Sequence, residues 1–167
     1  PPSAEEKGTA FEMAEELIQI LEDIMEKNPN KFRLVKSPEE ITNDKDIMQV
    51  VYGMENGAPI ESKLSNIKLF SDMGINYITL AHSKSNHISD SSYDENKNWG
   101  GLSPFGREVV TEMNKQGVMI DISHVSDAAF YEVLQLTKTP VIASHSSLRH
   151  FVPGFERNVS DDMLREL

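Results

Sequence analysis

The sequence lacks cysteine altogether, which excludes disulfides, cysteine-based zinc sites and thiol catalysis. Long apolar runs are also missing, because no stretch approaches the roughly 20 residues that a membrane span needs. Basic residues are scarce, with 16 Lys and Arg against 27 Asp and Glu, so no basic stripe is available for a phosphate backbone. We therefore expect no nucleic-acid partner and no membrane span in this segment. With no signal segment either, the localisation stays unknown.

The residues that are present are typical of a globular protein. Hydrophobic residues make up 38% and charged residues 26% of the 167 positions, which predicts one domain over residues 1–167 with a substantial core. The chain opens at Pro1-Pro2 without methionine and closes on a helix that has just begun. We therefore expect the parent protein to extend at both ends.

A unit of apolar strand, polar turn and amphipathic helix repeats from Ile47 onward, which indicates βαβ units and a parallel sheet. The expected strands are residues 32–35, 47–54, 77–82, 118–124 and 141–145. The expected helices are residues 5–27, a start at Ser37-Pro38 with Glu40 in a capping box, residues 60–73, 105–116 and 127–137, and a capped helix at the end. A long polar loop is expected at residues 83–103.

Polar side chains stand at the carboxyl ends of four predicted strands, namely Glu55, His82, His124 and His145. Active sites of parallel α/β folds are built at that edge. Residues two and four positions before each of them are apolar or small, which predicts that all four side chains point to one face. Three imidazoles and a carboxylate suit a metal such as zinc, although the residue types alone leave open which of them are ligands.

Each of these residues also has a simpler interpretation. A histidine at a strand end can be a hydrogen-bonded structural residue, and Glu55 can be a carboxylate in a glycine-rich turn. Asp121, a polar residue within a predicted buried strand, either orients a histidine ring or bonds to backbone groups. His87 and His150 fall in loops, and we expect them at the surface.

Five segments taken together resemble the membrane-dipeptidase (renal dipeptidase-like) family. Residues 53–57 (GMENG) are similar to its Gly-x-Glu-Gly-Gly turn, and residues 77–83 (YITLAHS) to its Tyr-Leu-Thr-Leu-Thr-His strand. Residues 101–106 (GLSPFG), 120–126 (IDISHVS) and 140–146 (PVIASHS) follow in the family's order. The resemblance covers roughly residues 47–167, and it implies a (β/α)8 TIM-type barrel of the metal-dependent hydrolase kind, an α/β fold present here as an incomplete internal portion with about five of eight strands.

The resemblance also implies a function: hydrolysis of dipeptides by a zinc-held hydroxide at a site with two zinc ions. Glu55 would bridge the ions, and His124 and His145 would complete the ligands of the second. His82 would contact the scissile carbonyl and stabilise the oxyanion, and Arg157, or Arg149 in its place, would hold the substrate carboxylate. A homodimer is possible by resemblance alone.

The sequence departs from the family pattern in two places. The His-x-Asp pair of the first barrel strand does not occur, and the late aspartate would lie after Leu167. We therefore expect the fragment itself to be inactive, and the full-length protein to be a zinc metallopeptidase. The alternatives are another amidohydrolase-type enzyme (lactonase, phosphoesterase or deaminase) and a degenerate, non-catalytic barrel.

Overall fold

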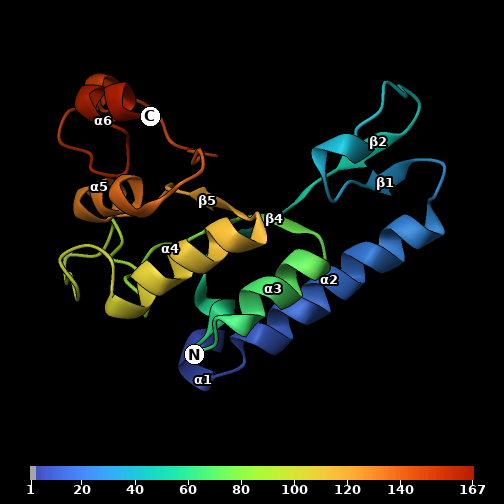
Figure 1. Ribbon diagram of the computed structural model, residues 1–167, viewed down its shortest axis with the longest axis horizontal. Coiled ribbons are helices and arrows are strands. Elements are labelled where there is room, and N and C mark those ends of the chain that lie inside the picture. Colours follow the sequence, from blue (N-terminus) through green and yellow to red (C-terminus); the bar gives the residue numbers. More distant parts are fainter. Residues whose placement is uncertain (1–2) are drawn as a thin grey trace.

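The computed structural model describes residues 3–167, in which strands and helices alternate along most of the chain (Figure 1). The α-helices are α1 (Ala4–Lys7), α2 (Ala10–Lys27), α3 (Ser65–Asp72), α4 (Pro104–Gln116), α5 (Asp127–Leu136) and α6 (Asp161–Glu166). The strands are β1 (Phe32–Leu34), β2 (Met48–Val50), β3 (Tyr52–Glu55), β4 (Ile75–Thr79) and β5 (Met119–Asp121). Short 3-10 helices cover Pro38–Glu40, Ala58–Ile60 and Arg149–Phe151.

All strand pairs are parallel, as the alternating pattern predicted. β3, β4 and β5 form one sheet in that order, and β1 pairs with β2 in a second. Helices α3, α4 and α5 follow β3, β4 and β5 in turn and contact each other in sequence order (Figure 1). The core lies between these helices and the sheet; its fully buried large side chains are Phe70, Phe130, Ile60, Ile67, Ile78, Leu80, Ile88, Leu102, Met113 and Ile120.

The predicted starts of the helix near residue 105 and of the C-terminal capped helix are confirmed. The Ser103 side chain accepts a hydrogen bond from the backbone N–H of Gly106 at 2.8 Å, and Pro104 occupies the first helical position. α4 ends at Gly117 in the left-handed conformation (φ +70°), as a helix-terminating glycine predicts. Ser126 and Ser160 cap α5 and α6 in the same way.

Three local predictions are wrong. The expected helix 5–27 is divided at Gly8, which has φ +67° and ends α1 before α2 begins. The helix expected after Ser37 is a single 3-10 turn, because Glu40 accepts a bond from the Lys36 N–H and Ser37 makes no side-chain cap. The expected strand 47–54 is divided at Val51, since its first half pairs with β1 and its second half with β4.

The expected strands 118–124 and 141–145 are shorter than predicted, because a side chain accepts hydrogen bonds from backbone N–H groups that would otherwise pair between strands. β5 ends at Asp121, whose Oδ1 accepts the backbone N–H groups of Ser123 and Ser144 at 3.0 Å each. The expected strand 141–145 is reduced to one bridge between Ile142 and Asp121. Consequently His124 and His145 stand in turns that follow the parallel segments. His82 likewise lies after the end of its strand, β4.

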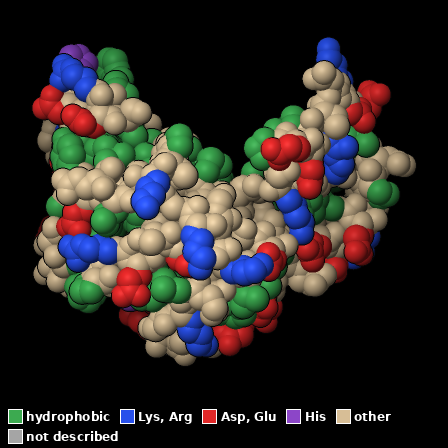
Figure 2. Space-filling model, in the orientation of Figure 1, with side chains coloured by type: hydrophobic (Ala, Val, Ile, Leu, Met, Phe, Trp, Pro, Cys, Tyr) green, Lys and Arg blue, Asp and Glu red, His purple; other side chains and the backbone are tan. Residues whose placement is uncertain are grey.

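The other edge of β3 faces a groove of about 720 Å³ beneath α2. Apolar side chains of α2 line it, including Met13, Leu17 and Leu21, which are all exposed. Figure 2 shows the molecule hollowed between the part that carries β1 and β2 and the part that carries α5 and α6. Within residues 3–167, no helix is long and apolar enough to cross a membrane.

Candidate metal centre

The four polar residues that the sequence placed at strand ends converge on one point. Glu55 Oε1 lies 3.3 Å from His82 Nε2, 3.2 Å from His124 Nε2 and 3.0 Å from His145 Nε2. The two Nε2 atoms of His124 and His145 are 2.8 Å apart. One oxygen and three nitrogens of the type that bind transition metals therefore form a single cluster.

Glu55 and His124 are held by turns with unusual backbone geometry. Glu55 is the last residue of β3, and Asn56 after it has φ +83°. His124 itself has φ +69°, a conformation that few residues other than glycine adopt. Such strained positions cluster at functional sites, where the surrounding structure enforces them.

The rings of His82 and His145 each have a serine hydroxyl at the nitrogen that faces away from Glu55. Ser83 Oγ lies 2.8 Å from His82 Nδ1, and Ser144 Oγ lies 2.6 Å from His145 Nδ1. The sequence analysis missed both serines, although each is adjacent to its histidine in the chain. These contacts fix the rings with Nε2 toward the cluster.

His124 differs from the other two histidines. Its side chain is only 8% exposed, and within the described residues its buried Nδ1 has no hydrogen-bond partner. Burial, together with the charges of Arg157, His82 and His145, lowers the pKa of His124 to about 4, against the opposing charge of Glu55. Within residues 3–167, the hydrogen-bond contact of the His124 ring is therefore made through Nε2 alone, in the cluster.

Asp121 connects the sheet to the cluster. Its fully buried carboxylate accepts hydrogen bonds from the hydroxyls of Thr79 and Ser144 at 2.6 Å each, besides the two backbone N–H groups already described. Burial raises the pKa of Asp121, but the hydrogen bonds outweigh it and leave the pKa below its ordinary value. Asp121 therefore makes contacts of both expected kinds. It bonds to backbone N–H groups, and it is linked to the His145 ring through the Ser144 hydroxyl.

The two candidate arginines lie in different surroundings. Arg157 is buried, and its guanidinium donates to Ser146 Oγ and to the backbone oxygen of His145 at 2.9 Å each. Between residues 3 and 167, no carboxylate lies within 4.0 Å of it. Arg149 instead forms two 2.7 Å bonds with the carboxylate of Asp127. Arg149 is thus already paired, whereas Arg157 is not.

The remaining histidines lie away from the cluster. His150 is exposed, as expected. His87 is half-buried rather than exposed, because its ring stacks on Phe105 with centroids 5.6 Å apart. Neither contributes to the cluster around Glu55.

The chain is an α/β protein in which a carboxylate and three histidines gather after the carboxyl ends of parallel strands. Proteins of this class build their active sites at that edge. The ligand atoms of Glu55, His82 and His124 all lie within 4.8 Å of one another, so this group could hold a metal ion. The chain belongs to the membrane dipeptidase family (peptidase family M19), whose model matches residues 1–167.

Individual relatives agree with this family. The chain is 35% identical to the dipeptidase tcpJ of Claviceps purpurea over 90% of its length, and 31% identical to dipeptidase 3 of Mus musculus over 99%. The structure is similar to an amidohydrolase from Pseudomonas aeruginosa, with a TM-score of 0.86 and 29% identity over 93% of this chain and 47% of that one. The chain spans 36% of the first relative and 34% of the second, about a third of their length.

Proposed function

We propose that the full-length protein containing this chain is a zinc-dependent dipeptidase. Its family and the names of its relatives support this function. The observation that carries it is the cluster itself, in which one carboxylate oxygen lies 3.0–3.3 Å from three imidazole nitrogens. A set of nitrogen and oxygen ligands at this spacing fits zinc.

Glu55, His124 and His145 are the proposed ligands, and the second oxygen of Glu55 would allow its carboxylate to bridge two ions. Zinc held there acts as a Lewis acid, which polarises a carbonyl group and lowers the pKa of water. The low pKa of His124 keeps its ring neutral near pH 7, as a ligand must be.

The serines beside His82 and His145 support different roles for the two rings. The Ser144 hydroxyl donates a hydrogen bond to the Asp121 carboxylate, so the Nδ1 of His145 must carry the hydrogen of its bond to Ser144. The Nε2 of His145 then carries a lone pair. Ser83 makes no other side-chain bond within the described part and can donate to His82 Nδ1, which leaves the hydrogen on Nε2. We therefore assign His145 as a ligand and His82 as the donor that stabilises the oxyanion.

Arg157 is the proposed binding group for the free carboxylate of a dipeptide. A buried guanidinium without an acidic partner is costly, and a substrate carboxylate would compensate its charge. Two of its five N–H donors bond to Ser146 and His145, so donors remain for a ligand. This unpaired cation favours a substrate with an anionic group, such as a dipeptide, over an uncharged lactone or nucleobase.

We also propose that the parallel strands form part of a (β/α)8 barrel. The order β3-β4-β5, with Ile142 bridged beside β5, is the order in which consecutive barrel strands pair. The free edge of β3 and the apolar groove beneath α2 would be covered by further strands. On this proposal, residues 1–167 are one partial domain and the isolated chain is inactive.

The proposed function is tested by assaying the full-length protein on a panel of dipeptides, with zinc and after chelation. We expect turnover to disappear on chelation and to return with zinc. Glu55→Gln should abolish turnover, because the amide cannot bridge two cations as a carboxylate does. The control is Glu95→Gln, which changes an exposed glutamate of the neighbouring loop and should leave turnover intact. Chelator-resistant turnover, or full activity of Glu55→Gln, would contradict the proposal.

A further inference from the structure

A pair of exposed aromatic rings adjoins the cluster through Tyr93, which lies beside His124. The ring of Tyr93 lies 5.9 Å from the His124 ring, centroid to centroid, and its residue is 49% exposed. Phe155, 40% exposed, meets Tyr93 edge to face at 5.8 Å. The two rings come from segments more than 60 residues apart in the chain, and neither has a role in the proposed function so far.

The backbone beneath Tyr93 is fixed to the cluster. Ser92 donates its backbone N–H to the backbone oxygen of His124 at 2.7 Å, and Ser91 forms a bridge with Val125. The Tyr93 N–H bonds to Ser91 Oγ at 3.2 Å. The ring of Tyr93 therefore projects from backbone that is attached to His124 and Val125.

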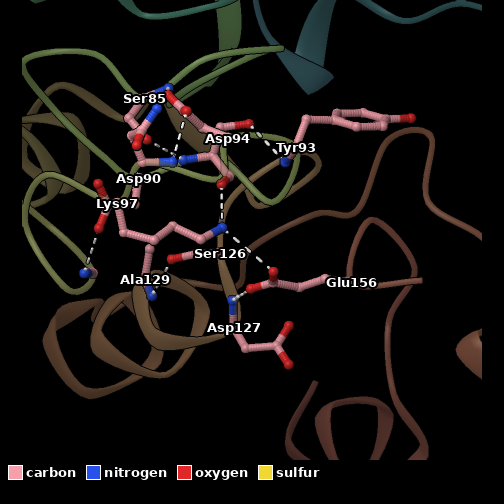
Figure 3. A network of polar contacts seen from close by, with 12 residues as sticks. Ser85, Asp90, Tyr93, Asp94, Lys97, Ser126, Asp127, Ala129 and Glu156 are labelled. Carbon is pink, nitrogen blue, oxygen red and sulfur yellow. Dashed lines mark hydrogen bonds and ion pairs between the residues drawn. The ribbon is translucent and has the colours of Figure 1, made fainter. Parts of the chain in front are cut away.

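The segment that carries Phe155 is tied to the same loop. Lys97 Nζ lies 3.3 Å from Glu156 Oε2, and the other oxygen of Glu156 accepts the backbone N–H of Asp127 at 3.1 Å. Figure 3 shows Lys97 between the loop and Glu156, with the ring of Tyr93 extending away from this network. Buried Asp90 holds the far side of the loop, accepting the N–H groups of Asn98, Trp99 and Gly101 at 2.7–3.2 Å. The backbone segments that carry the two rings are thus connected to each other by contacts within the protein.

We propose that Tyr93 and Phe155 form an aromatic wall that selects dipeptides with a large apolar side chain. This inference rests on the proposed function. The Tyr93 ring presents an apolar surface next to His124, and Phe155 extends that surface through its contact with Tyr93. Burial of apolar surface favours a substrate side chain that covers it. Small differences in apolar contact change kcat/KM by roughly 10-fold or more.

The test compares the full-length wild-type protein with Tyr93→Ala and Phe155→Ala on two dipeptide series, X-Gly and Gly-X, where X is Ala, Leu or Phe. We expect kcat/KM for Leu and Phe to fall about 10-fold in one of the two series, with little change for Ala. Tyr93→Phe keeps the ring and should keep the preference. Phe151→Ala removes a 73% exposed aromatic ring and serves as the control.

The outcomes separate the two proposals. A uniform fall for all substrates with unchanged zinc content, or no change in either variant, would overturn the aromatic wall while leaving the dipeptidase intact. Wild-type protein that hydrolyses no dipeptide would overturn the proposed function, and the aromatic wall with it. If one alanine variant is misfolded by circular dichroism, the other and Tyr93→Phe decide the result.

Discussion

Ser144 donates its hydroxyl to the buried carboxylate of Asp121 at 2.6 Å, and the same hydroxyl lies 2.6 Å from His145 Nδ1. A carboxylate can only accept, so the direction of the two bonds is determined: His145 donates to Ser144, and Ser144 donates to Asp121. This arrangement gives His145 the tautomer that leaves Nε2 free. Two side chains that do not reach the cluster themselves thereby orient one of its proposed ligands.

The first prediction concerns this serine. Ser144→Ala should weaken zinc binding by the full-length protein about 10- to 100-fold, because the His145 ring loses the bond that fixes its orientation and tautomer. Zinc affinity measured by competition with a chelator checks this directly. Ser144→Thr, which keeps the hydroxyl, should restore much of the affinity.

The matched control for Ser144 is Ser147→Ala. Ser147 is exposed, belongs to the same segment and makes no side-chain hydrogen bond within the described chain. Its zinc affinity should equal that of the wild type. Equal affinities of Ser144→Ala and Ser147→Ala would show that Ser144 has no positioning role.

The second prediction concerns Arg157. Each charge-assisted hydrogen bond contributes about 1.5–3 kcal/mol, so Arg157→Met should raise KM for dipeptides about 10- to 100-fold. The same dipeptides with an uncharged C-terminal amide should be affected much less, since they carry no carboxylate for the guanidinium to bind. Steady-state kinetics on matched acid and amide substrates measure both.

Two arginine controls accompany this measurement. Arg165→Met removes an exposed arginine that pairs with Asp162 and should change neither substrate class. Arg149→Met should lower stability, because it leaves Asp127 without its bidentate partner, but should retain the preference for the free carboxylate. A lost preference in Arg149→Met rather than Arg157→Met would reverse the assignment.

The sequence alone predicted the residues of the cluster better than the strands that carry them. Glu55, His82, His124 and His145 were identified because a carboxyl-end position and a resemblance pointed to the same residues, and the structure brings all four together. The strand ends were misplaced because Asp121 takes over backbone N–H groups that a ladder would use. The spacing of apolar residues does not reveal where a side chain replaces a backbone group as a hydrogen-bond partner.

Other features depend on contacts between distant segments. No local sequence pattern predicts the hydrogen bond between Ser144 and Asp121, which are 23 residues apart. The sequence does place a serine directly beside each of two histidines, in His82-Ser83 and Ser144-His145. The aromatic wall is a similar case, since Tyr93 and Phe155 meet only through the folded loop.

The third prediction concerns stability and pH in metal-free protein. The pKa of His124 is about 4 in the folded chain and 6.5 for an ordinary histidine. Between these values the unfolded chain binds a proton that the folded chain does not, so stability should fall as pH decreases from 6.5 to 4. Urea unfolding of chelated protein across this range measures the slope. His124→Gln should flatten this dependence of stability on pH. His150→Gln, which changes an exposed histidine, should leave the dependence as it is in the wild type. An unchanged slope in His124→Gln would contradict the burial argument.

The last prediction separates the roles of His82 and His145, whose Nε2 atoms lie at nearly equal distances from Glu55, 3.3 and 3.0 Å. If His145 is a ligand, His145→Ala should lose bound zinc in the full-length protein, as should His124→Ala. If His82 is an oxyanion donor, His82→Ala should keep its zinc and lose about 10²- to 10³-fold in kcat, the usual effect of removing one such donor. Elemental analysis after dialysis and kcat on a single dipeptide provide the two readouts. Loss of zinc in His82→Ala together with retention of zinc in His145→Ala would exchange the two roles. The hydrogen bonds between each serine and its histidine Nδ1 would then run in the opposite direction to the one assigned.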